Sequence, residues 1–181
     1  FAVLGPGYVT TILDAPLESL SWILIAPAGI GMGIGVLLMG SIGKRFKQKN
    51  LSIVGFFAVG IAFILLPYGS KFASRELVLA INSYLPLIFD ITILHIIVVL
   101  ALIIGLSISL VFISSNAIIQ METGFRMRGR IYGFLNALVG GVSFMPVVLS
   151  GGLADILGGG TVISGVGILM LVLSIIFFFL K

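Results

Sequence analysis

Charged residues divide the chain into long stretches that contain no Asp, Glu, Lys or Arg. A helix needs about 20 residues, at 1.5 Å each, to cross a hydrocarbon layer of about 30 Å. Five of the uncharged stretches reach that length. They predict transmembrane helices over about 19–40, 51–68, 93–115, 131–150 and 160–180.

Two further uncharged stretches are too short to cross a membrane. Residues 77–89 contain Asn82, Ser83 and Pro86, which indicates an interfacial or extramembrane segment. Residues 1–13, which precede Asp14, are mostly apolar but are interrupted by a Gly-Pro-Gly sequence, and the chain opens on Phe rather than Met. We therefore interpret 1–16 as the outer end of a truncated transmembrane helix, followed by a five-helix remainder over 17–181.

Composition supports a lipid environment. Hydrophobic residues make up 60% of the chain and charged residues 9%, with a mean hydropathy of +1.32. Soluble domains carry about 25% charged residues, so a soluble enzyme or binding module is excluded, and disorder needs far lower hydrophobicity. The absence of cysteine excludes a disulfide framework and a thiolate metal site. The predicted fold class is an all-α integral membrane protein, with five full transmembrane helices and the end of a sixth.

The basic residues predict how the helices are oriented. Short cytoplasmic loops retain Lys and Arg, and eight of the ten basic residues follow the first, third and fifth predicted spans. We expect a multi-pass protein of the inner or plasma membrane with a cytoplasmic C-terminus. The net charge of +4 then reflects loops beside lipid, and no nucleic-acid partner is expected. The residues expected on the cytoplasmic side are Lys44, Arg45, Lys47, Lys49, Arg126, Arg128, Arg130 and Lys181.

Glycines are spaced for close helix contacts. Gly29 and Gly33, Gly31 and Gly35, and the series of Gly133, Ala137 and Gly141 all repeat every four residues. In lipid, such small residues allow two helix backbones to approach and gain dispersion contacts. The pattern predicts tight packing on both helices.

Catalytic and metal-binding groups are scarce along the sequence. There is one His, no Cys, and no acidic residue well inside a predicted span, so we expect neither an enzyme nor a metal or cofactor site. Asp155 follows a small-residue turn and is expected to cap an outer loop. A carboxylate that changes its charge within the membrane, if the protein uses one, is expected in a segment upstream of this chain.

Two stretches carry a family resemblance. Residues 36–45 look like the loop motif G-x-L-a-D-r-x-G-r-k, and 128–159 are similar to the fifth helix of the C-terminal half in bacterial drug and siderophore efflux permeases. The sequence thus resembles the C-terminal six-helix half of a major facilitator superfamily transporter. Val36, Gly40 and Ser41 stand where the motif has Gly, Asp and Arg, so its Asp-based gating salt bridge is not expected here.

The resemblance implies a secondary active transporter that exports small amphipathic compounds by alternating access. Its partners would be the lipid bilayer, a small-molecule substrate and the N-terminal half of the same polypeptide. The alternative from the residues is a non-transporting polytopic membrane scaffold or assembly subunit. A third is an intramembrane enzyme with its active residues outside this chain.

Candidate functional residues follow from these expectations. Asn136 is a candidate for contact with substrate, or else for a hydrogen bond between helices. Phe134, Phe144 and Met145 are candidates for the apolar lining of the same cavity. His95 is the titratable group with the greatest membrane depth, or else an interfacial residue. The cytoplasmic loop and gate candidates are Gly43, Lys44, Arg45, Arg128 and Arg130.

Overall fold

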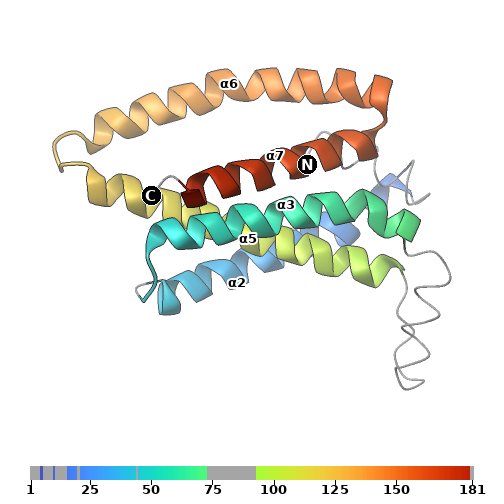
Figure 1. Ribbon diagram of the computed structural model, residues 1–181, viewed down its shortest axis with the longest axis horizontal. Coiled ribbons are helices and arrows are strands. Elements are labelled where there is room, and N and C mark those ends of the chain that lie inside the picture. Colours follow the sequence, from blue (N-terminus) through green and yellow to red (C-terminus); the bar gives the residue numbers. More distant parts are fainter. Residues whose placement is uncertain are drawn as a thin grey trace.

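The computed structural model consists of helices joined by short turns (Figure 1). The described residues are 5, 10, 16–19, 21–43, 45–72 and 93–179. Within these ranges, a 3-10 turn at Leu17–Ser19 and a π-helical turn at Ser21–Ile25 precede the α-helices. The α-helices are α2 (Ala26–Ile42), α3 (Gln48–Phe72), α5 (Ile93–Glu122), α6 (Arg128–Leu157) and α7 (Gly159–Phe179).

Some sequence predictions fall outside this description. The expected helix end at 1–16 is described only at positions 5, 10 and 16, and the segment 77–89 is not described. Lys44 and Lys181 also lie outside the described residues.

The prediction of five transmembrane helices is confirmed. Five helices are long and apolar enough to cross a membrane, and the part of the chain that the structure describes contains no strand. They cover Ser21–Ser41, Gln48–Pro67, Leu94–Glu122, Arg128–Leu157 and Gly159–Phe179. The chain is therefore an all-α, multi-pass membrane protein.

Three of the helices, α3, α5 and α6, are longer than the sequence predicted. Both α5 and α6 contain 30 residues, or about 45 Å of helix, which spans the hydrocarbon and reaches the headgroup regions. They extend past their apolar stretches because polar side chains at a helix end meet water and headgroups. Asp155 consequently lies inside α6 and does not cap a loop, which corrects that expectation. The turn comes at Gly158, whose φ of 84° suits a residue without a side chain.

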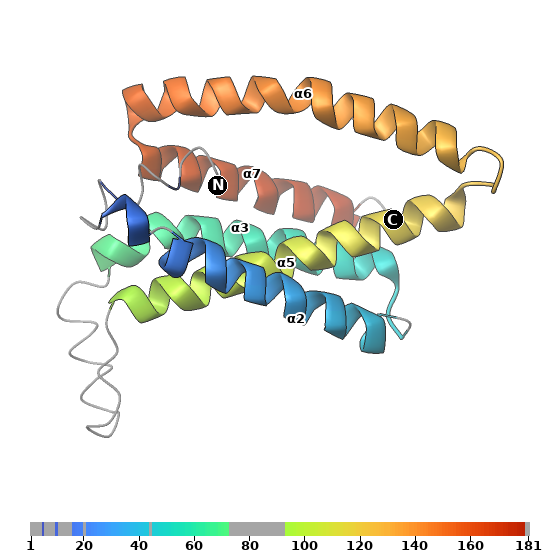
Figure 2. The same ribbon diagram turned by 180° about the vertical axis from the view of Figure 1, so that it is seen from behind.

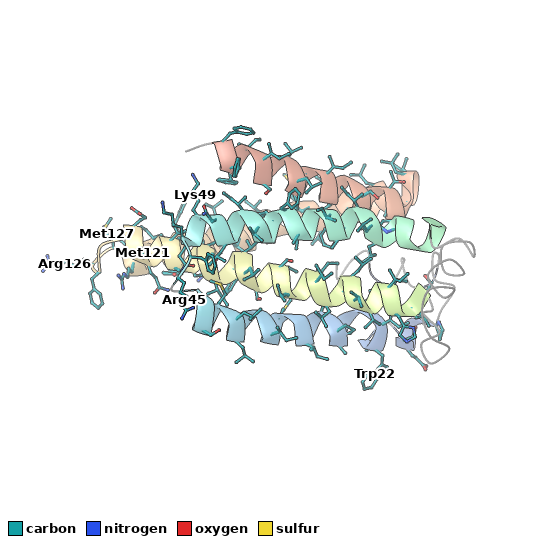
Figure 3. The ribbon with its side chains drawn as sticks, turned by 60° about the horizontal axis from the view of Figure 1, so that its bottom comes forward. Trp22, Arg45, Lys49, Met121, Arg126 and Met127 are labelled. Carbon is teal, nitrogen blue, oxygen red and sulfur yellow. The ribbon has the colours of Figure 1, made fainter. Side chains whose placement is uncertain are left out.

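Consecutive helices run in opposite directions, so the loops alternate between the two ends of the molecule. Figure 3 places Arg45, Lys49 and Arg126 at one end and Trp22 towards the other. We call the first of these the basic end; its described members are Arg45, Lys47, Lys49, Arg126, Arg128 and Arg130. The gathering of these side chains at one end matches the alternation of charge along the sequence.

The helices α2, α3, α5 and α7 pack into one bundle, in which α3 lies between α5 and α7 and α2 lies on α5. The core includes Leu24, Leu66, Ile97 and Ile104, each at most 1% exposed. Side chains from separate helices thus interlock along the middle of this four-helix bundle.

Glycine contacts bring α2 and α5 together. A Cβ on Gly31 would meet the backbone of Leu102 and Leu106, and a Cβ on Gly105 would meet the backbone of Ala28. Gly35 similarly lies against Ser109 and Leu106 of α5. The predicted contact through Gly31 and Gly35 is therefore confirmed. Nothing lies within 4 Å of a Cβ built on Gly29 or Gly33, so that face of α2 is open among the described residues.

The pair α3 and α7 meets in the same way. A Cβ on Gly60 would lie 2.9 Å from the Gly167 carbonyl oxygen, and one on Gly167 would lie 2.8 Å from the Gly60 oxygen. Nearby, the Ser174 hydroxyl donates a 3.0 Å hydrogen bond to the Ile53 carbonyl oxygen. These contacts hold α3 and α7 side by side, although the two helices are far apart in the sequence.

The helix α6 stands outside the four-helix bundle. Figures 1 and 2 show it as a separate layer beyond α7, joined to the bundle at its two ends. No residue of α6 is buried. A Cβ on Gly133 or Gly141 would meet nothing within 4 Å, and Ala137 is exposed. The expected tight contact on this helix is therefore not made by the described residues, and it stays a prediction.

Candidate functional site

Arg128 closes the turn between α5 and α6. Its Nη2 donates a 2.9 Å hydrogen bond to the Gln120 carbonyl oxygen, and its Nε donates a 3.3 Å bond to the Thr123 oxygen. The guanidinium also lies 5.6 Å from the centre of the Phe125 ring. The last carbonyl groups of a helix lack partners within it and carry partial negative charge. Arg128 therefore caps α5, a role that the basic pattern alone did not identify.

A small polar cluster continues from this cap. The Gln120 side-chain amide donates a 3.2 Å hydrogen bond to the Tyr132 hydroxyl, which donates a 3.4 Å bond to the Asn116 carbonyl oxygen. Tyr132 lies on α6 and the other two residues lie on α5. These hydrogen bonds show that the side of α6 that carries Tyr132 faces α5 at the basic end.

The turn between α2 and α3 is also fixed by local bonds. The Gly43 amide donates to the Met39 carbonyl oxygen at 3.0 Å, and the Gln48 Nε2 donates to the Gly43 oxygen at 2.9 Å. Gly43 is buried and a Cβ there would meet Met39, whereas Arg45 is exposed. Gly43 thus shapes the turn. Arg130 is exposed on α6, so the described gate candidates share the basic end but occupy two separate turns.

The candidates for the substrate cavity all lie on α6, and all are exposed. Phe134, Phe144 and Met145 are 69%, 73% and 67% exposed. Because successive helix positions differ by about 100°, Phe134 and Met145 point away from the side that carries Asn136. Phe144 lies about 80° from Asn136. The structure therefore does not bring the four candidates onto one face.

Other candidate chemistry is limited among the described residues. His95 is exposed in the first turns of α5, at the end away from the basic end. Within the described ranges, no three His, Asp or Glu side chains are grouped so that they could hold a metal ion.

A cavity that sequence reasoning missed lies at the basic end, between the start of α3, the end of α5 and the end of α7. Its volume is about 610 Å³. None of the predicted substrate-cavity residues lines it. The lining residues are Lys47, Gln48, Lys49, Ser52, Ile53, Phe56, Ser115, Ile118, Met121, Glu122 and Phe177. The sequence alone indicates only the basic residues over 44–49. The apolar walls cannot be predicted from it, because they come from helices that are distant in sequence.

The geometry defines a class, a multi-pass helical membrane protein with a basic end and one helix outside its bundle. No protein-family profile, curated protein or solved structure matches the chain.

Proposed function

We propose that this chain forms most of the C-terminal bundle of a secondary active transporter of the major facilitator type. The transporter exports small amphipathic compounds by alternating access, in which two bundles rock about a site near the membrane midplane. The observation that carries the proposal is α6, a membrane-spanning helix that has no buried residue and carries polar and small side chains within its span.

The side of α6 that faces the bundle can be traced along its length. Tyr132 contacts α5, and Ser150 lies 18 residues later, which is about five helical turns and returns to the same line. Asn136 and Ser143 both lie within about 40° of that line. Gly133 and Gly140 lie about 80–100° to one side of it, with nothing within 4 Å of a Cβ built on either. Polar groups therefore recur along the side of α6 that faces the other helices.

Contact with hydrocarbon is unfavourable for the polar groups on this side of α6. The Asn136 side chain makes no hydrogen bond within the described part of the chain, although Ser143 bonds the Val139 carbonyl oxygen of its own helix. An amide without a partner in an apolar medium costs about 2–7 kcal/mol, depending on the reference state. Asn136 therefore requires water or another polar group, as polar residues in transmembrane helices commonly face a bundle interior or a water-filled path. A water-filled path along a membrane-spanning helix is what transport requires.

The proposal also assigns sides. The basic end lies in the cytoplasm of a cell whose inner or plasma membrane holds the protein, because basic loops are retained there. The C-terminal end of α7, at Phe179, lies at the basic end and is then on the cytoplasmic side. The side of α6 that carries Asn136 lines the substrate path. Other exposed parts of α6 contact the N-terminal half of the same polypeptide.

Cysteine labelling of the full-length polypeptide in membrane vesicles tests the water-filled path. Because this chain has no cysteine, Asn136→Cys introduces the first thiol into it. Leu138→Cys is the matched control, since it lies about 200° around the same helix. A charged, membrane-impermeant maleimide should label Asn136→Cys and spare Leu138→Cys.

Transport itself is measured as energised efflux of a cationic amphipathic dye from cells that carry the same polypeptide. Efflux that falls when Asn136→Cys is labelled supports the transporter. Labelling with no efflux of any tested amphipathic compound would instead favour a membrane scaffold. Equal labelling of both cysteines, or of neither, would contradict the water-filled path.

A further inference from the structure

The cavity at the basic end has a polar mouth and an apolar interior. Lys47, Lys49 and Glu122 lie at the helix ends, whereas Phe56 lies seven residues after Lys49 along α3, or about 10 Å deeper. The Phe56 and Phe177 rings stack with their centres 6.4 Å apart and form part of the deep wall. Figure 3 shows Lys49 and Met121, two of the lining residues, at this end of the bundle. The cavity thus crosses the depth at which a membrane changes from headgroups to acyl chains.

Two buried polar atoms in the cavity lining have no hydrogen-bond partner among the residues that the structure describes. They are the Gln48 Oε1 and the Ser52 Oγ. The Gln48 amide is held in place because its Nε2 donates to the Gly43 carbonyl oxygen at 2.9 Å. Leaving such atoms unpaired costs about 1–3 kcal/mol each. A ligand that offers both an acceptor oxygen for the Ser52 hydroxyl and a donor for Gln48 would satisfy them.

Charge narrows the class of ligand. The lining contains two lysines and one glutamate, so the formal charge of the cavity is positive, and Arg45 adds to the field at this end. An anionic headgroup complements this excess of positive groups, whereas a zwitterionic headgroup brings no net negative charge. Basic pockets between transmembrane helices bind anionic headgroups for this reason. Glu122 accepts hydrogen bonds only, so it too favours a headgroup that carries hydroxyl donors.

We propose that this cavity binds one molecule of phosphatidylglycerol from the membrane leaflet at the basic end. The phosphate lies between Lys47 and Lys49 and accepts from Ser52. The glycerol hydroxyls of the headgroup donate to Gln48 and Glu122, and an acyl chain runs along the Phe56 and Phe177 rings. A volume of about 610 Å³ suits a headgroup with the upper part of a chain, and it falls in the usual range for ligand sites. The proposal does not depend on transport.

Native mass spectrometry of the full-length, detergent-purified polypeptide tests the site. The variant Lys47→Gln/Lys49→Gln removes both cations from the mouth. Phosphatidylglycerol affinity should fall about 30-fold, since a lysine near a membrane surface contributes about 1 kcal/mol to anionic lipid binding. The matched control, Arg126→Gln/Arg130→Gln, removes the same charge from the same end but outside the cavity. Its affinity should change less than threefold.

Binding measurements with other lipids and with a soluble headgroup analogue distinguish the possible ligands. Phosphatidylethanolamine and phosphatidic acid should bind at least fivefold more weakly than phosphatidylglycerol, since the first lacks net charge and the second lacks headgroup hydroxyls. Water-soluble glycerol phosphate should not displace the lipid, because it has no acyl chain for the aromatic wall.

A cavity-filling variant provides a second readout. Ser52→Phe keeps every charge but occupies the space, so it should abolish specific binding while thermal unfolding shows that the fold is retained. If Ser52→Phe destabilises the protein, the lysine pair and its control decide alone. Equal loss of affinity in both double variants would show binding to general surface charge and would overturn the proposal. Unchanged affinity in Lys47→Gln/Lys49→Gln would overturn it as well.

Discussion

A pair of glycine substitutions on α2 tests the packing of the bundle. A Cβ on Gly31 would lie 2.9 Å from the Leu102 carbonyl carbon and 3.0 Å from the Leu106 nitrogen, in addition to meeting the Leu102 oxygen. A Cβ on Gly33, two residues further along, would meet nothing within 4 Å. Gly31→Ala and Gly33→Ala therefore make the same chemical change on the same helix, and they differ only in what the new methyl group touches.

The size of the difference follows from two opposing effects. Replacing glycine by alanine inside a helix stabilises it by about 0.5–1 kcal/mol, and this gain applies at both positions. At Gly31 the methyl group meets backbone atoms of α5, which cannot rotate away as a flexible side chain would. Overpacking of this kind costs about 1–3 kcal/mol. Gly33→Ala should thus be neutral or stabilising, and Gly31→Ala should be less stable than it by about 1–3 kcal/mol.

Unfolding by SDS in mixed micelles measures the two free energies under one set of conditions. Gly105→Ala, on the α5 side of the same contact, should lose stability as Gly31→Ala does, because its methyl group would meet Ala28. Equal unfolding midpoints for Gly31→Ala and Gly33→Ala would refute the close contact between α2 and α5.

Three further predictions concern a hydrogen bond, the topology and energy coupling. Ser174→Ala removes a bond between helices and should cost about 0.6 kcal/mol in the same SDS assay, whereas Ser164→Ala removes only a bond within α7 and should cost less. Single cysteines at Met127 and Gly158 should be labelled from opposite sides of the membrane, and labelling from one side would end the five-span arrangement. His95→Gln should keep proton-driven efflux, measured as dye export against a pH gradient. Loss of coupling with substrate binding intact would place the proton site on this chain.

The number of membrane spans and their approximate positions follow from sequence because both depend on local properties. Hydrophobic length is set by the bilayer, and a charge at the end of a span fixes where that end meets water. Helix length beyond the apolar stretch is different. Pro146 and the Gly151-Gly152 pair disfavour a helix before Asp155, yet α6 continues through them to Leu157, and the turn comes at Gly158.

Helix partners are harder to predict, and the glycines of α2 show why. Gly29 and Gly33 have the same spacing as Gly31 and Gly35. The pattern therefore predicts close helix contact equally on two different faces of α2. Which face is used depends on where α5 lies, and that is a property of the whole bundle. The same reasoning applies to α6, whose small residues remain open within the described chain.

The cavity at the basic end was missed for a related reason. Its two aromatic wall residues, Phe56 and Phe177, are far apart in sequence and meet only because α3 packs along α7. The basic sequence beside Ser52 was visible, but a charged loop before an apolar helix is ordinary in membrane proteins. The informative feature is the pair of unpaired polar atoms, which only a folded structure reveals.

Lipid as the solvent changes what an exposed side chain means on α6. In water, the exposure of Phe134, Phe144 and Met145 would indicate a binding surface, whereas beside acyl chains those side chains lose nothing. Exposure of an amide has the opposite consequence, because hydrocarbon offers it no hydrogen bond. Among the four predicted cavity residues, Asn136 is therefore the one whose position demands water or a protein neighbour. For this reason the contrast between Asn136→Cys and Leu138→Cys tests transport more sharply than any substitution of the aromatic residues.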